Sequence, residues 1–249
     1  MSDMVSQLFR AQSHLAGTSE PSLWLCLIVT LAFAIVAFLA RAVSFSGGVA
    51  GIVVCFLLCA GAGLPALAPL LAVFAMAWLG TKVGYQEKVK IGTAEKIEGR
   101  NAFQVLANLS VAAICATLYS VTGKAAFLVA MAASLSEAAA DTVSSEVGQL
   151  SKEKARLIST WEAVPAGTDG AITALGTVSG IAAAMAVSVV CALTGIISWK
   201  RFAIPILAAL CGTIADSFLG ALFERRKLLN NDAVNFLGTL VAALIAISA

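Results

Sequence analysis

Long apolar runs constrain this fold more than any other feature of the sequence. A helix needs about 20 predominantly apolar residues to cross a bilayer. Only 12% of the 249 residues are charged, which is about half the share found in a soluble domain. We therefore predict an all-α, polytopic transmembrane bundle, with an N-terminal tail over 1–21 and one transmembrane domain over 22–249. About eight spans are expected: 22–41, 47–64, 66–83, 102–121, 125–144, 170–195, 202–222 and 233–249.

The distribution of Lys and Arg predicts the orientation of the bundle. If the N-terminus lies outside, twelve basic residues fall in inner loops and four fall on the outer side. Because inner loops carry the excess of Lys and Arg, we expect an N-out, C-out protein of the cell inner membrane. The three long polar loops, 84–101, 145–169 and 223–232, then share the cytoplasmic side.

A weak internal repeat runs through the sequence. Segments 171–184 and 233–246 align with LGT in register, and 102–113 fits the same frame, so that Gln104, Thr173 and Asn235 become equivalent. Duplicated two-helix units would explain this match. Chance similarity in an Ala-rich sequence is the alternative.

Several classes of chemistry are excluded by what the sequence lacks. The only histidine is His14, in the N-terminal tail, so a histidine general base or a His-rich metal site is not expected. No GxxxxGK[ST], GxGxxG or DDxxD motif occurs, which argues against a Walker-type ATPase and an aspartate-rich prenyltransferase. The six cysteines all lie in apolar runs without a CxxC pair. We expect them to pack as small apolar residues, with no disulfide framework.

Carboxylates interrupt the apolar spans. The segment EAAADTVSSEVG (137–148) follows an apolar run, and an acidic side chain at the centre of a transmembrane helix costs roughly 2.5–3.5 kcal/mol. Intramembrane ionisable residues usually serve a function, so we interpret Asp141 and Asp216 as functional. For Glu137, neutralisation of a basic residue or a place in the hydrated interface is the favoured interpretation.

Two loops that contain glycine are candidate phosphate sites. Segment 81–101 spaces Lys and Arg among glycines, and such groups bind phosphate oxygens. An ordinary positive-inside loop touching anionic headgroups is the alternative, and it explains this loop when taken alone. VPAGTDG (164–170) predicts a turn that opens a helix, with Thr168 or Asp169 as N-cap. A helix N-terminus binds phosphate, although capping alone is the alternative.

These loops form an ordered series of motifs over about residues 40–249. The series is TKVGxxxKxxxG at 81–92, GRNAFQVLAN at 99–108, ADTVSSEVG at 140–148, PAGTDG at 165–170, ADSFLGALFE at 215–224 and NDAVN at 231–235. Together the motifs resemble the integral membrane family called domain of unknown function 92. That family includes the plant phytyl-phosphate kinase of vitamin E synthesis.

The resemblance implies an activity: Mg²⁺-dependent phosphoryl transfer from a nucleoside triphosphate to an isoprenyl or phytyl monophosphate. CTP is a candidate donor, and the product is the diphosphate, formed at the cytoplasmic face. A phosphate monoester is already anionic at pH 7, so the acceptor needs no general base. The expected partners are the nucleotide, the lipid monophosphate and the bilayer, with no nucleic acid.

The residues expected to act fall into two groups. Hard divalent cations bind oxygen ligands, and the expected catalytic and metal-binding residues are Asp141, Glu146, Asp216 and Asp232. The expected phosphate- or nucleotide-binding residues are Lys82, Lys88, Arg100, Asn101, Gln104, Asn108, Thr142, Ser145, Thr168, Ser217, Asn231 and Asn235.

An ion-coupled transporter of a small or anionic substrate is the alternative function. Repeated helices and intramembrane acidic groups fit such a protein. The charge, however, gathers at one face rather than at the midplane, and the repeats run parallel rather than inverted. A purely structural membrane protein would not explain buried acids on several helices.

Overall fold

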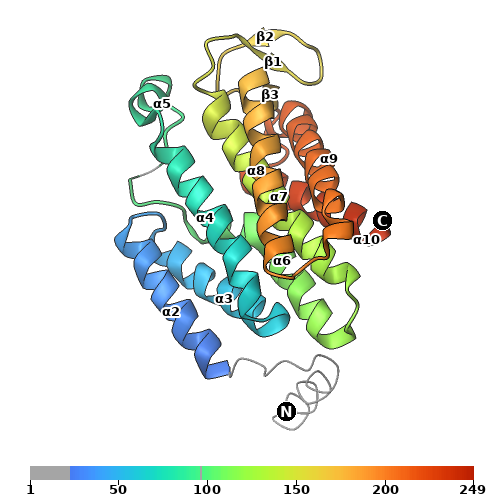
Figure 1. The fold of residues 1–249 in the computed structure, drawn as a ribbon. Coiled ribbons are helices and arrows are strands. Elements are labelled where there is room, and N and C mark those ends of the chain that lie inside the picture. The colour runs from blue at the N-terminus through green and yellow to red at the C-terminus, as the bar shows by residue number, and fades with distance from the viewer. Residues whose placement is uncertain (1–22, 96) are drawn as a thin grey trace.

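The computed structural model describes residues 23–95 and 97–249, and the predicted tail over 1–21 lies outside this part. The described chain is a helical bundle (Figure 1). Its helices are α2 (Leu23–Leu39), α3 (Phe45–Ala62), α4 (Leu67–Lys82), α5 (Tyr85–Ile91), α6 (Ala102–Thr122), α7 (Ala126–Gly148), α8 (Ala174–Leu193), α9 (Ala203–Leu219) and α10 (Asn231–Ser248). Short helical turns are η1 (Leu64–Ala66), η2 (Trp199–Arg201) and η3 (Gly220–Glu224).

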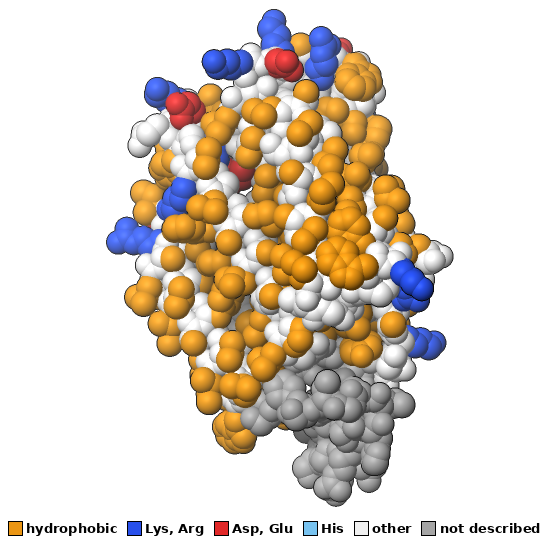
Figure 2. All heavy atoms as spheres, viewed as in Figure 1, with side chains coloured by type: hydrophobic (Ala, Val, Ile, Leu, Met, Phe, Trp, Pro, Cys, Tyr) orange, Lys and Arg blue, Asp and Glu red, His pale blue; other side chains and the backbone are white. Residues whose placement is uncertain are grey.

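The predicted all-α membrane bundle is confirmed. Seven helical segments of the described chain are long and apolar enough to cross a membrane, and α2 is a shorter apolar helix of 17 residues. Each of the eight predicted runs therefore forms a helix. Figure 2 shows that hydrophobic side chains cover most of the visible flank, while charged side chains gather toward the end that carries α5 and the strands. The N-out, C-out orientation stays a prediction.

Helix α7 is the centre of the bundle. Every residue from Val129 to Ala140 is buried, and the helix contacts α4, α6, α8, α9 and α10. Small residues allow this close packing. A Cβ atom at Gly180 of α8, for example, would lie 2.9 Å from the backbone oxygen of Ala140. Any polar side chain on this part of α7 is therefore held inside the protein.

A small antiparallel sheet follows α7. Its strands are β1 (Ala155–Leu157), β2 (Ala163–Val164) and β3 (Ala171–Ile172), in the order β2-β1-β3. The sequence predicted a polar loop over β1 and β2 and the start of a membrane span over β3, because strands of two or three residues carry no readable alternation.

The predicted N-cap at Thr168 or Asp169 is wrong. The N-cap of α8 is Thr173, whose side-chain oxygen accepts a hydrogen bond from the backbone nitrogen of Gly176 at 3.0 Å. The segment 165–170 is instead a turn that leads into β3.

The expectation that no cysteine forms a disulfide is also wrong. Cys26 of α2 and Cys59 of α3 are bonded, with their Cα atoms 5.8 Å apart. Cys26 lies near the start of α2 and Cys59 near the end of the following helix, so the short turn between the helices brings the two residues together. A separation of 33 residues in the sequence hides this pairing.

The proposed repeat stays a hypothesis. Gln104 is the third residue of α6, Thr173 precedes α8 as its N-cap, and Asn235 is the fifth residue of α10. Residues that are equivalent in the alignment thus occupy different positions relative to the helix starts.

Candidate functional site

A cavity of about 400 Å³ lies among α2, α3, α4, α6 and α7. Most of its wall is apolar, and its polar lining comes from the ends of α4 and α6 and from the loops beside them. The apolar lining includes Phe33, Ala34, Ala37, Val54, Leu70, Val73 and Phe74. The polar lining includes Arg41, Thr81, Lys82, Tyr85, Glu95, Arg100, Gln104, Asn108 and Thr142. The cavity is therefore amphipathic, with basic groups among its polar lining.

The backbone of Arg100 is fixed against the start of α3. Its nitrogen donates to the oxygen of Ala42 at 3.1 Å, and its oxygen accepts from the nitrogen of Ser44 at 2.9 Å. This contact requires glycine in α3, because a Cβ atom at Gly47 would lie 2.1 Å from the Arg100 oxygen. The backbone of residues 99–101 (GRN) is therefore held in place, and this fixes the base of the Arg100 side chain.

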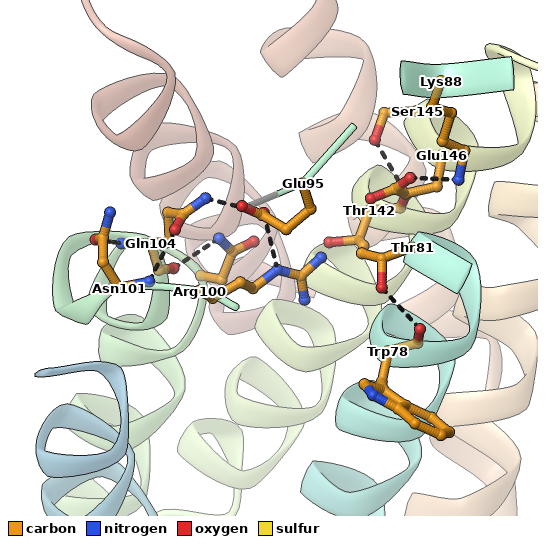
Figure 3. Close-up of polar contacts among 11 residues, drawn as sticks. Trp78, Thr81, Lys88, Glu95, Arg100, Asn101, Gln104, Thr142, Ser145 and Glu146 are labelled. Atoms are coloured by element: carbon orange, nitrogen blue, oxygen red, sulfur yellow. Dashed lines mark hydrogen bonds and ion pairs between the residues drawn. The ribbon is translucent and has the colours of Figure 1, made fainter. Parts of the chain in front are cut away.

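The residues next to Arg100 cap α6. Asn101 and Gln104 form a capping box, which satisfies backbone donors at the helix start. Gln104 also donates its Nε2 to Glu95 at 3.1 Å, and the same Glu95 oxygen lies 3.9 Å from Nε of Arg100. Figure 3 shows this group on one side of the close-up, with the Arg100 guanidinium extending toward the side of Thr81 and Thr142.

Lys88 and Glu146, two of the predicted site residues, bind each other. Nζ of Lys88 lies 2.6 Å from Oε2 of Glu146 (Figure 3). It donates a second 2.6 Å bond to the backbone oxygen of Gly80. The Lys88 side chain is fully buried, and that of Glu146 is 12% exposed. The ion pair therefore fastens α5 to α4 and α7, so both residues have structural partners instead of facing the cavity.

An acidic cluster lies on the other side of α7. Glu137 and Asp141 of this helix lie close enough to Asp216 of α9 for the charges of the three carboxylates to interact. Arg100 is close enough to Asp141 for their charges to interact. Thr142, the residue after Asp141, lines the cavity. The acidic cluster therefore adjoins the polar part of the cavity.

Two loops extend this acidic region. Glu224 ends the π-helical turn η3, and its charge interacts with those of Asp169, Asp141 and Asp232. Gly170 packs directly on this turn, because a Cβ atom there would lie 2.2 Å from the nitrogen of Ala221. The PAGTDG and ADSFLGALFE motifs are thus in contact. In the described residues, no group of three or more His, Cys, Asp or Glu side chains is arranged to hold a metal ion.

The structure brings together some of the predicted binding residues and not others. Five of them line the cavity: Lys82, Arg100, Gln104, Asn108 and Thr142. Ser145 and Thr168 donate their hydroxyls to nearby backbone oxygens, those of Thr142 and Pro165. The remaining predicted residues outside the cavity lining are at helix termini or within α9 and α10: Asn101, Ser217, Asn231 and Asn235. The expected metal ligands Asp141, Asp216 and Asp232 lie within the acidic region, and Glu146 lies in the ion pair.

Other residues of this region were not predicted. Arg41, Tyr85 and Glu95 line the cavity, although each looks like an ordinary interfacial residue in the sequence. Glu224 lies inside a motif that the sequence singled out, and only the π-helical turn reveals how it joins the acidic region. Glu137 was interpreted as neutralised or hydrated, but its side chain is 1% exposed.

A bundle of apolar helices with an amphipathic cavity and buried carboxylates defines an integral membrane protein. The family model described as "Integral membrane protein DUF92" matches residues 28–243. The chain belongs to this family.

Three relatives are similar over much of the chain. The "Uncharacterized membrane protein MJ0933" of Methanocaldococcus jannaschii is 34% identical over 234 residues, which are 90% of this chain and 93% of that protein. "Protein VTE6, chloroplastic" of Arabidopsis thaliana is 32% identical over 71% of this chain and 56% of its own length. The "Uncharacterized membrane protein sll0875" of Synechocystis is 36% identical over 71% of this chain and 70% of its own length. No solved structure matches the chain.

Proposed function

We propose that this chain is a membrane-embedded kinase of isoprenyl (phytyl-type) monophosphates. It transfers a phosphoryl group from a nucleoside triphosphate, with CTP a candidate, and yields the lipid diphosphate. The observation that carries this proposal is the amphipathic cavity, whose basic polar lining adjoins the acidic cluster. The sequence motifs support the same activity, and the likeness to Protein VTE6 supports a membrane-embedded enzyme.

The cavity suits a lipid with a single tail. Its volume of about 400 Å³ is in the range of pockets that hold one small ligand, about 300–1,000 Å³. The apolar wall would take the tail. Arg100, Lys82 and Arg41 would bind the phosphate, because charge-assisted hydrogen bonds from Arg and Lys to phosphate are strong.

The reaction needs positioning and charge neutralisation rather than a general base. An oxygen of the acceptor phosphate attacks the γ-phosphorus of the nucleotide. The bond from this phosphorus to the β–γ bridging oxygen breaks, and the nucleoside diphosphate leaves with that oxygen. The acceptor is already anionic at pH 7, so no proton must be removed. Catalysis of this kind rests on alignment and electrostatic stabilisation.

The acidic region would hold the Mg²⁺ that accompanies the nucleotide. Mg²⁺ binds through one or two carboxylates together with waters and substrate phosphates. Asp141, Asp216 and Asp232 are the proposed ligands, with Glu224 beside them. Glu146, the fourth ligand expected from the sequence, is paired with Lys88 and is not among the proposed ligands. When bound, the ion neutralises charge on the phosphates of the donor.

The reaction would take place at the cytoplasmic face of the cell inner membrane. Nucleotide arrives from the cytosol, and the lipid keeps its tail in the bilayer. The polar loops that form the site carry most of the basic residues, which supports this orientation.

An ion-coupled transporter is the second candidate. The observation that favours it is the fully buried Glu137 at the centre of α7, because intramembrane carboxylates mark ion pathways in transporters. Ion-dependent uptake of a substrate into proteoliposomes would support transport, and phosphorylation of the lipid would support the kinase.

The direct test uses purified protein in detergent. It is incubated with Mg²⁺, each of the four nucleoside triphosphates, and phytyl, farnesyl or geranylgeranyl monophosphate, and products are detected by mass spectrometry. The wild type should form the diphosphate, and Asp141→Asn should form none. Glu153→Gln, a change of an exposed acidic residue in the loop before β1, is the matched control and should retain activity. Folded wild-type protein that forms no product with any donor and acceptor would overturn the proposal.

A further inference from the structure

Glu137 has a carboxylate oxygen that nothing in the described protein binds. Its side chain is 1% exposed, and Oε1 is buried without a hydrogen-bond partner. Oδ2 of Asp216, on α9, is likewise buried and unpartnered. Buried polar atoms without partners are rare, and each one calls for an explanation such as an ion or water at the site. Two such oxygens lie in one acidic cluster, where a bound cation would give both a partner.

Both acidic side chains lie against the same glycine of α10. From the position that a Cβ atom would take at Gly238, Oε1 of Glu137 is 2.6 Å away and Cβ of Asp216 is 3.3 Å away. A second glycine, Gly212 of α9, gives room to the rest of the Glu137 side chain, because its Cβ position lies 2.7 Å from Cγ. Helices α9 and α10 thus each have a glycine, which carries no side chain, where Glu137 lies. The Glu137 carboxylate therefore occupies a preformed space, the niche, beside these two helices.

The formal charges around this niche favour a divalent cation. Three carboxylates interact here, those of Glu137, Asp141 and Asp216, and Arg100 is the cation that interacts with Asp141. Glu224 interacts with both aspartates, so the five side chains carry a formal charge of −3 when all are ionised. Leaving this charge unneutralised inside a membrane protein would be strongly unfavourable. A divalent cation offsets most of it.

We infer that Glu137 and Asp216 bind a divalent cation of the Mg²⁺ type in the protein before any nucleotide arrives. The ion contacts Oε1 of Glu137 and Oδ2 of Asp216 next to Gly238, and Asp141 contributes negative charge. Two protein oxygens are enough, because Mg²⁺ commonly keeps water as its other ligands. This site shares Asp216 with the nucleotide-associated site proposed above and adds Glu137, which lies deeper along α7, and it requires neither nucleotide nor lipid.

Binding of Mn²⁺ in the absence of nucleotide and lipid tests this inference. Mn²⁺ is titrated into purified protein in detergent, and the free ion is measured by electron paramagnetic resonance. The wild type should bind one Mn²⁺ that Mg²⁺ displaces and Na⁺ does not. Glu137→Gln should weaken binding by at least the roughly 10–100-fold that is typical for changes around a metal site.

Two further variants make this test more specific, one that should weaken Mn²⁺ binding and one that should leave it unchanged. Gly238→Ala retains every carboxylate but places a methyl group between Glu137 and Asp216, so it should also weaken binding. Glu153→Gln changes an exposed acidic residue outside the acidic region and should bind Mn²⁺ like the wild type. Size-exclusion profiles and thermal unfolding of each variant show whether it is folded.

Three results would overturn the inference. They are a folded wild type that binds no Mn²⁺, a Glu137→Gln variant that binds as tightly as the wild type, and displacement of Mn²⁺ by Na⁺. None of these measurements depends on phosphoryl transfer. Failure of the kinase proposal and failure of the cation site can therefore be told apart.

Discussion

The ammonium group of Lys88 and the carboxylate of Glu146 lie 2.6 Å apart and join α5 to the centre of the bundle. Lys88 is 58 residues away from Glu146 in the sequence and is fully buried. Because its second bond goes to the backbone of Gly80, one side chain links three helices. The short helix α5 and the loop that follows it, which contributes Glu95 and Arg100 to the cavity, depend on this link.

Replacing Lys88 by Met should destabilise the protein strongly. The change leaves Glu146 without its partner in a largely buried place, and removing one partner of a buried ion pair costs about 3–5 kcal/mol. Thermal unfolding in detergent should show a clearly lower Tm for Lys88→Met. Lys90→Met is the matched control, because Lys90 is exposed on the same helix, and its Tm should not change. An unchanged Tm for Lys88→Met would show that the ion pair does not hold α5.

Replacing Arg100 by Met should reduce kinase activity with little effect on stability. A hydrogen bond to a charged group contributes about 1.5–3 kcal/mol, so kcat/KM for the lipid monophosphate should fall by about 10–100-fold. Arg100→Lys should retain part of the activity, because it keeps the charge but not the two-pronged geometry. Arg226→Met, at an exposed position of the loop after η3, should match the wild type. Steady-state kinetics over a range of acceptor concentrations measure these effects, and an unaffected Arg100→Met would remove Arg100 from the phosphate site.

Enlarging Ala34 should change which tail lengths are accepted. Ala34 lines the cavity from α2, so Ala34→Phe shortens the space for a tail. The ratio of kcat/KM for geranylgeranyl to that for geranyl monophosphate should fall by at least about tenfold, since a single methylene group in an apolar pocket is worth about 1–3 kcal/mol. Ile35→Phe alters the next residue, which is 59% exposed, and should leave the ratio unchanged. Equal ratios in both variants would show that the tail binds elsewhere.

Gly47 and Gly51 form a matched pair on α3. Both line the cavity, but a Cβ atom at Gly47 would lie 2.1 Å from the Arg100 oxygen, whereas one at Gly51 meets nothing within 4 Å. Gly47→Ala should therefore displace Arg100, lower the Tm and reduce activity. Gly51→Ala should keep both, and parallel unfolding and activity measurements check this. Similar behaviour of the two variants would contradict the support that α3 gives to Arg100.

The helices could be predicted because the signal for each one is local. Apolar length alone marks a membrane span, and α7 was found even though it carries Glu137 and Asp141. The extension of α7 to Gly148 and the three short strands escaped prediction, since polar residues and strands of two or three residues leave no periodic pattern. The N-cap of α8 was predicted at Thr168 or Asp169 instead of Thr173 for the same reason.

The sequence could predict which residues belong to the site, but not which of them bind each other. Sequence chemistry identified Asp141, Asp216 and Arg100, which the structure brings close together. It also placed Lys88 and Glu146 with the phosphates and the metal, because nothing in the sequence indicates that these two residues meet. The pairing of Cys26 with Cys59 was missed for the same reason.

The disulfide gives α2 a fixed end. Cys26 is bonded to α3 near the start of α2, whereas the other end of α2 is held by hydrogen bonds. There Nε1 of Trp78 donates to the backbone oxygen of Ala40 at 3.4 Å, and the backbone of Arg100 bonds to Ala42 and Ser44. Hydrogen bonds break far more easily than a covalent bond, so any separation of α2 from the cavity would begin beside Arg41 and not at Cys26. The disulfide therefore sets the direction in which this wall of the cavity can open.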